Sequence, residues 1–339
     1  MKKTLLINVL SLMTVFTLSA CSNDATQESA NSQSFVQESS EAVATSVEIT
    51  DAHGTIDVPV NPETVVSLDS RTYATLEDWD ISLAAAPKGV MPASSAYVSD
   101  ESVQDIGNHR EPNLEVLAAT EPDLVIVGQR FGGYYDEIKE LVPDAVVIDL
   151  NFDVSEDAQT PGENLVNGLK NATLSLGKIF DKTAEAESLT SELDQNIATA
   201  KEAYDGENAV LSVIVSGGNI GFSAPHSGRV WGPLYELLDW EPALEVDNTT
   251  SDHQGDEISV ESIAQSNPDW IMVLDRDAAI SSDGESVPAK DVIEQAPALQ
   301  DTQAIQSQQV VFAPAETYTN ESIETFIDLF GILADAFNQ

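Results

Sequence analysis

The chain has 339 residues and a formal net charge of −44, because 58 Asp and Glu side chains face only 14 Lys and Arg. So acidic a chain lacks the clustered cations that contact phosphates, which excludes nucleic acid as a partner. With 42% hydrophobic residues it can bury a core, which excludes a wholly disordered protein. Its length suits two domains of roughly 150 residues.

Residues 1–20 read as a secretory signal peptide, because Lys2 and Lys3 precede a mostly apolar run that is short for a membrane span. Residues 18–21, Leu-Ser-Ala-Cys, resemble a bacterial lipobox. This resemblance implies lipidation of Cys21, the single cysteine of the chain. The alternative is an ordinary signal peptide followed by an unmodified cysteine. Residues 21–46 then predict a flexible tether, since their polar composition cannot offset the entropy of ordering.

From Val47 onward, short β-branched runs alternate with helical stretches, which is typical of an α/β architecture. The expected strands cover 64–68, 124–127, 145–150, 210–215, 270–274 and 309–312. Residues 162–204 carry Leu and Ile at helical spacing, and a break at Gly177 or at 180–182 stays open. We therefore expect an N-terminal lobe over 47–160, an inter-lobe helical segment over 161–206 and a C-terminal lobe over 207–339.

The segments 114–130 and 260–276 resemble each other. Each predicts a helix, a Pro-Asp turn, a buried strand and an arginine, so that Glu115 aligns with Glu261 and Arg130 with Arg276. A duplicated lobe is favoured over a chance match of a common unit. Because open α/β sheets bind ligands outside the carboxyl ends of their strands, we expect the site in the cleft between the lobes.

Three arginines follow expected strands and are candidates for ligand contact: Arg130, Arg229 and Arg276. Guanidinium groups that converge from both lobes would bind an anion through several charge-assisted hydrogen bonds. The alternative is that each pairs with a nearby carboxylate such as Asp275. Trp231 stands two residues from Arg229, so we expect it at the cleft as well.

The histidines show no paired spacing, which disfavours capture of a bare divalent metal ion. His253 and Tyr318 could complete the coordination of ferric iron that an organic chelator already holds. The alternative is a polar loop histidine and a tyrosine after a strand, neither of them a ligand. The sequence has no G-x-S-x-G, P-loop or H-E-x-x-H motif, and 216–221 predicts a hairpin turn rather than a phosphate cradle. An enzyme is therefore not expected.

In their order and spacing, these features resemble the solute-binding lipoproteins of iron-siderophore ABC importers, from about Val47 to the C-terminus. The resemblance rests on Val58-Pro-Val-Asn-Pro62, Asp105-Ile-Gly107, Glu111-Pro-Asn-Leu-Glu115, the Glu-Pro-Asp-Leu-Val-Ile strand and Leu176-Gly-Lys-Ile-Phe180. It implies a monomer of two Rossmann-like lobes bridged by a long α-helix, with a ligand cleft between the lobes and no intrinsic cofactor. Lipid anchorage would hold it on the extracytoplasmic face of the plasma membrane, at the cell surface or in the periplasm.

Within this family the chain is most similar to binders of catecholate siderophores. That subgroup implies ligand contacts from Arg130, Arg229, Arg276, His253 and Tyr318, with the last two as candidate direct ligands of Fe(III). The ferric siderophore would pass to the importer's permease, which works with an ATPase.

Glu115 and Glu261 would dock on arginines of that permease.

Binding of haem, cobalamin or a hydroxamate siderophore remains an alternative. A surface-anchored hydrolase and an adhesive surface protein are further alternatives from other classes.

Overall fold

The computed structural model describes residues 45–280 and 287–339, which belong to one compact unit, Ala44–Gln339. The signal peptide over 1–20, Cys21 and the tether up to residue 44 lie outside the described residues. Within 45–280 and 287–339, no helix combines the length and the apolar character that a membrane span requires.

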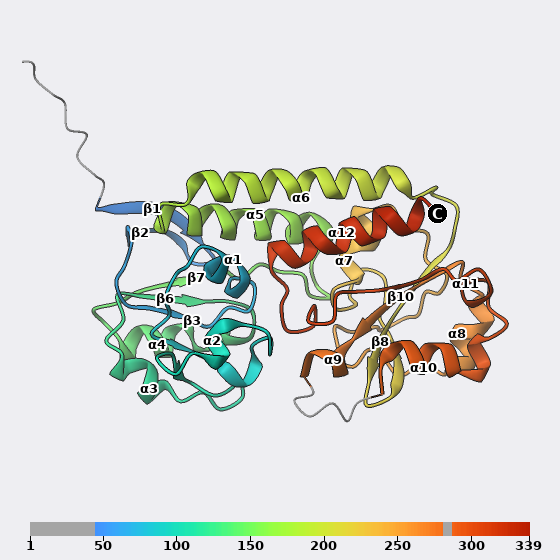
Figure 1. Ribbon diagram of the computed structural model, residues 1–339, viewed down its shortest axis with the longest axis horizontal. Coiled ribbons are helices and arrows are strands. Elements are labelled where there is room, and N and C mark those ends of the chain that lie inside the picture. The colour runs from blue at the N-terminus through green and yellow to red at the C-terminus, as the bar shows by residue number, and fades with distance from the viewer. Residues whose placement is uncertain (1–44, 281–286) are drawn as a thin grey trace, which may run out of the picture. The chain divides into compact units, whose positions relative to one another are not determined.

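The N-terminal lobe contains a five-stranded parallel sheet in the order β5-β4-β3-β6-β7 (Figure 1). Its strands are β3 (Val65–Ser67), β4 (Ala85–Ala86), β5 (Gln104–Asp105), β6 (Leu124–Val127) and β7 (Val146–Asp149). Successive residues of β6 are buried on opposite faces: Leu124 and Ile126 pack in one hydrophobic cluster, Val125 and Val127 in another. Both faces of this sheet are thus covered, as a parallel sheet requires.

Short helices surround this sheet: α1 (Tyr73–Asp78), η1 (Lys88–Val90), α2 (Ala96–Ser99), α3 (Leu114–Ala119), η2 (Gln129–Tyr134) and α4 (Tyr135–Leu141). Leu76 of α1 packs on the side of Leu124, whereas Leu117 of α3 and Ile138 of α4 pack on the side of Val125. A separate antiparallel hairpin, β1 (Ser46–Asp51) with β2 (Gly54–Pro59), starts the described chain.

The C-terminal lobe has a four-stranded sheet in the order β11-β10-β8-β9. Its strands are β8 (Val210–Ser216), β9 (Asn219–Phe222), β10 (Trp270–Asp275) and β11 (Val310–Phe312), and only β9 runs antiparallel to its neighbour. The turn between β8 and β9 places Gly217 at φ 59° and Gly218 at φ 73°, a left-handed region that glycine adopts readily. The hairpin turn expected over 216–221 is therefore confirmed.

The helices of this lobe are α7 (Gly232–Leu237), α8 (Val260–Ser266), α9 (Arg276–Ile280), α10 (Ala289–Gln295), η3 (Pro297–Leu299) and α11 (Gln303–Gln306). All six strands expected from the sequence are present, each within one residue of its expected ends. The repeat has a structural counterpart in its Pro-Asp turns. Asp123 accepts a hydrogen bond from the Thr64 amide just before β3, and Asp269 accepts one from the Ala209 amide just before β8.

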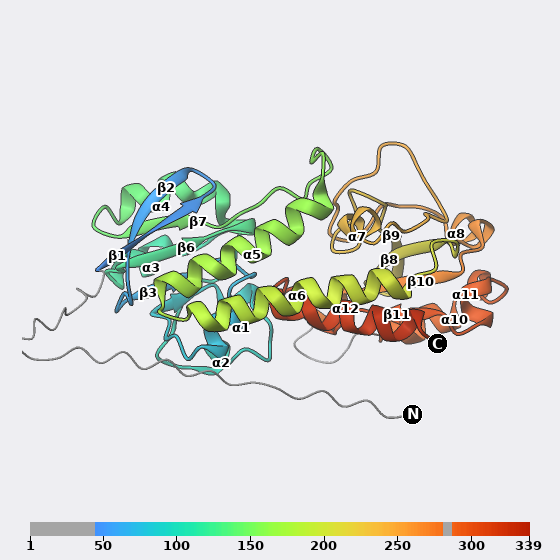
Figure 2. The same ribbon diagram turned by 90° about the horizontal axis from the view of Figure 1, so that it is seen from above.

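Three helices connect the two halves: α5 (Pro161–Ile179), α6 (Thr183–Ala203) and α12 (Ile323–Phe337). Figures 1 and 2 show α6 running beside both α5 and α12. The break that the sequence left open falls at 180–182, where Asp181 has a φ of 54° and the Lys182 amide donates to the Gly177 carbonyl. The inter-lobe connection is therefore a helical hairpin, and α12 brings the C-terminus back along it.

Candidate functional site

The side chains that line the candidate site gather where strands of both sheets end. Arg71 follows β3, Gln129 follows β6, and Phe152 follows β7, so parallel strands bring them to one edge. Arg229 follows the β8–β9 hairpin, and Glu321 follows β11. These five residues help to line a cleft of about 510 Å³, which lies between the lobes as the sequence predicts.

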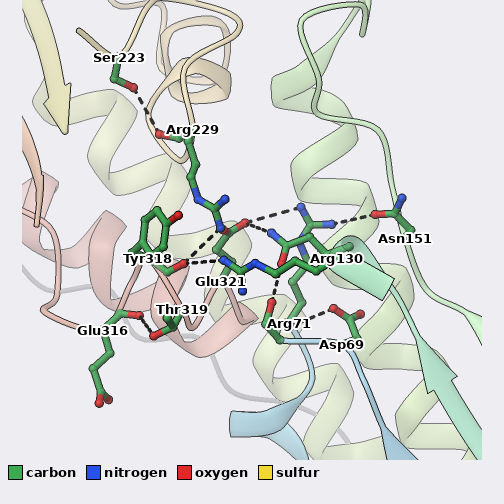
Figure 3. Close-up of polar contacts among 12 residues, drawn as sticks. Asp69, Arg71, Arg130, Asn151, Ser223, Arg229, Glu316, Tyr318, Thr319 and Glu321 are labelled. Atoms are coloured by element: carbon green, nitrogen blue, oxygen red, sulfur yellow. Dashed lines mark hydrogen bonds and ion pairs between the residues drawn. The ribbon is translucent and has the colours of Figure 1, made fainter. Parts of the chain in front are cut away.

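Three arginines surround Tyr318, which is buried after β11. Figure 3 shows two of them, Arg130 and Arg229. The guanidinium carbons of Arg229, Arg276 and Arg130 lie 4.4, 5.3 and 5.8 Å from the centre of its ring. Arg130 and Arg229 also donate hydrogen bonds of 3.3 and 3.2 Å to the Tyr318 carbonyl. Arg276 donates to the Ser216 hydroxyl at 3.1 Å. The structure therefore brings together three arginines and one tyrosine that the sequence singled out.

A fourth arginine and a carboxylate complete this arginine cluster, and sequence reasoning missed both. The Arg71 guanidinium stacks 3.8 Å from the Phe152 ring, and its side chain is only 3% exposed. Glu321 lies between the arginines: one carboxylate oxygen pairs with Arg229, and the other lies 3.7 Å from Arg71 and accepts from Gln129 at 2.8 Å. Arg71 could have been found, because it too follows an expected strand.

The arginine cluster holds more positive charge and more donors than the described protein uses. Arg71, Arg229 and Arg276 each have a buried Nε, and Arg130 a buried Nη1, for which the described residues offer no partner. Burial, followed by the positive charge of Arg229, lowers the pKa of Arg130. An anion placed here would relieve that repulsion and accept those hydrogen bonds.

Backbone strain flanks two of the arginines. Gln129, just before Arg130, has a φ of 37°, and Val230, just after Arg229, has a φ of 64°. A positive φ is rare outside glycine and is a clear outlier for a β-branched residue, and such strain concentrates at functional sites.

Glycine is required beside the cluster, because a Cβ on Gly128 would stand 2.4 Å from the Asp69 carboxylate. Asp69 is itself 1% exposed, and burial raises its pKa against the opposing effect of Arg71.

Comparison with known proteins matches residues 65–317 to the family of periplasmic binding proteins. The chain belongs to this family. It is 27% identical over 321 residues to the petrobactin-binding protein YclQ of Bacillus subtilis, covering 94% of this chain and 93% of that one. It is also 27% identical over 259 residues to the ferric-anguibactin-binding protein FatB of Vibrio anguillarum, covering 76% of each.

Solved structures show the same fold. The crystal structure of YclQ superposes with a TM-score of 0.71 at 24% identity, over 87% of this chain and 99% of that one. The siderophore-binding protein BauB, bound to a complex between two molecules of acinetobactin and ferric iron, gives a TM-score of 0.72 at 24% identity, over 86% and 98%. The two-lobe α/β fold expected from the sequence is confirmed.

His253 lies on a loop of this periplasmic binding protein, beside the cleft-lining residue Ser251. Its side chain is 43% exposed, and its Nδ1 lies 3.6 Å from a carboxylate oxygen of Asp252. None of the contacts among the described residues joins His253 to Tyr318. Within the same residues, no group of three His, Cys, Asp or Glu side chains could hold a metal ion.

Trp231 differs from the expectation that it lies at the cleft. Its side chain is 0% exposed, packed in the hydrophobic core of the C-terminal lobe with its ring 6.4 Å from that of Trp240. The positive φ of Val230 turns the chain between Arg229 and Trp231, so the two neighbours face different surroundings. We therefore leave Trp231 out of the ligand-binding set.

Glu115 and Glu261 are both exposed in this periplasmic binding protein, each in the first turn of its helix. Asn113 caps α3 and Ser259 caps α8, each through a side-chain oxygen that accepts a backbone amide. The repeat thus presents the two glutamates on equivalent helix starts. Their docking role stays a prediction.

Proposed function

We propose that this protein captures a ferric siderophore of the catecholate class in the cleft between its lobes and hands it on for iron uptake. The arginine cluster carries the proposal: Arg130, Arg229 and Arg276 meet around Tyr318, and Arg71 joins them through Glu321. Each of the four has a buried N–H group that lacks a partner among the described residues. A ferric tris-catecholate is a trianion whose oxygens accept such hydrogen bonds.

The charge balance of the site supports an anionic ligand. Four arginines face Glu321, a carboxylate whose pKa burial alone would raise but Arg229, Arg71 and Arg130 lower overall. The site is thus positive within a chain of net charge −44. Two relatives named for siderophores, the petrobactin-binding YclQ and the ferric-anguibactin-binding FatB, add support.

Tyr318 and His253 are proposed as direct ligands of Fe(III) when the chelator leaves coordination positions open. Phenolate oxygen and imidazole nitrogen both suit ferric iron. Tyr318 lies at the centre of the arginine cluster, and the His253 loop is exposed at the cleft rim.

Delivery and anchorage are part of the same proposal. Membership of the periplasmic binding proteins supports partnership with an ABC importer, its permease and its ATPase. Glu115 and Glu261 would meet arginines of the permease, because opposite exposed charges steer encounter. Lipidation of Cys21 would hold the protein at the extracytoplasmic face of the membrane. In this role the protein performs no catalysis.

Removal of the positive charges tests the ligand class. We expect Arg130→Gln, Arg229→Gln and Arg276→Gln each to weaken binding of a ferric tris-catecholate by roughly 10- to 100-fold, the value of losing charge-assisted hydrogen bonds. Binding of an uncharged ferric trihydroxamate should change little. Lys290→Gln is the matched control, since it also removes a positive charge, and Lys290 is exposed on α10 and is not among the cleft-lining residues.

Titration calorimetry of each variant with both complexes gives the comparison. Equal losses for the charged and the uncharged complex would refute the electrostatic account of the site. Tight binding of the trihydroxamate alone would move the assignment to the hydroxamate class.

A further inference from the structure

Glu321 occupies the donors that an anionic ligand would need. Its carboxylate contacts Arg229 through one oxygen and approaches Arg71 and Gln129 through the other. Its side chain is 9% exposed and lines the 510 Å³ cleft, so a ligand there would meet it directly. Figure 3 shows it between the guanidinium groups of the two lobes.

A carboxylate in this position does more than neutralise charge. The two arginines that it contacts come from different lobes, Arg71 from the loop after β3 and Arg229 from the loop after the β8–β9 hairpin. A negatively charged ligand must compete with the carboxylate for the same N–H groups and must also sit near a like charge. An uncharged ligand does not experience this repulsion between like charges.

We propose that Glu321 is a specificity-determining residue that sets how much negative charge the site accepts in its ligand. The inference rests on the proposed function, and it assigns to Glu321 a role that lowers the affinity of the site for an anionic ligand. The resident carboxylate lowers the affinity for a trianionic complex and leaves that for an uncharged complex nearly unchanged. The arginines provide the attraction, and Glu321 limits it.

The proposal is tested by titrating the full chain with two probes: the ferric complex of a synthetic tripodal tris-catecholamide, charge −3, and an uncharged ferric trihydroxamate. Glu321→Gln keeps the shape of the side chain and removes the charge. We expect it to bind the trianion at least about fivefold tighter than the wild type, in the range typical of coupling between neighbouring groups. Its affinity for the uncharged complex should stay within about twofold, the range for groups that are not coupled.

Two further variants complete the design. Glu192→Gln makes the same change of net charge at an exposed position on α6 and should bind both probes as the wild type does. Glu321→Leu is a second neutral variant, used if Glu321→Gln does not fold by circular dichroism. Whichever neutral variant folds should show the selective gain for the trianion.

The outcomes separate this proposal from the proposed function. If the wild type binds the trianion but the neutral variant gains no more than Glu192→Gln, Glu321 does not set the ligand charge. An equal gain for both probes would also overturn the inference, since it would indicate a general loosening of the cleft. If the wild type binds neither probe, the siderophore assignment fails and this inference with it.

Discussion

The contact between Arg71 and Glu321 offers a quantitative test of the arginine cluster. At 3.7 Å, two unit charges attract by about 4 kcal/mol at the effective dielectric constant of about 20 that suits proteins. Both side chains are less than one tenth exposed, so the cost of removing them from water offsets much of this attraction. Arg71→Met leaves Glu321 with Arg229 and Gln129, and we expect a loss of about 3 kcal/mol in the free energy of unfolding.

A double-mutant cycle isolates the pair. Arg71→Met, Glu321→Gln and the double variant are unfolded with urea at neutral pH and followed by circular dichroism. The double variant should lose about 1–3 kcal/mol less than the sum of the single losses. Additivity within about 0.5 kcal/mol would refute the pairing. Glu192→Gln, on the exposed face of α6, should change stability by less than about 0.5 kcal/mol.

The pH dependence of the coupling has a definite sign. The folded-state pKa of Glu321 is below its ordinary value, so the stabilisation is present at neutral pH and is lost as the pH falls through that lowered pKa. The coupling between Arg71 and Glu321 should therefore shrink in acid. A coupling that grows as the pH falls would contradict the assignment of an ionised carboxylate.

The remaining predictions concern stability. Trp231→Ala should cost about 4 kcal/mol in urea unfolding, because the side chain is fully buried; a loss below about 1 kcal/mol would contradict the core position. Gly221→Ala places a Cβ 2.0 Å from the Gln254 carbonyl and should cost about 2 kcal/mol, whereas an unchanged midpoint would show that the loop gives way. Burial raises the pKa of Glu324, so ionisation of this carboxyl group destabilises the folded protein as the pH rises through that raised pKa. Glu324→Gln should therefore have a larger free energy of unfolding than the wild type between mildly acidic and neutral pH. Raising NaCl from about 0.1 M to about 1 M should raise the melting temperature by screening the self-repulsion of a chain of charge −44, and no change would refute a salt-sensitive surface.

Much of the fold can be predicted from local sequence patterns, namely β-branched runs and turn residues. The six strands are short β-branched runs bounded by turns, and all six form within one residue of their expected ends. The duplicated Pro-Asp turns could be recognised in the sequence, and in the structure Asp123 and Asp269 accept hydrogen bonds from equivalent backbone amides. Since each strand end fixes a place at one edge of a sheet, the convergence of Arg130 and Arg276 follows from the same patterns.

Other parts of the site depend on contacts that no local pattern encodes. Glu321 is one of 58 acidic residues, and only the tertiary fold places it between arginines of both lobes. Unusual backbone angles matter as well. Trp231 is close to Arg229 in sequence, yet the positive φ of Val230 turns the chain so that Trp231 is buried in the core. The return of α12 beside α6 likewise depends on packing between distant segments.

The most direct test of the proposed function is a calorimetric titration of the wild-type protein with a ferric tris-catecholate, with an uncharged ferric trihydroxamate run in parallel. The arginine cluster predicts saturable binding of the catecholate with a submicromolar Kd, on the order of −8 kcal/mol or stronger. The trihydroxamate should bind far more weakly. No saturable binding of the catecholate would contradict the assignment.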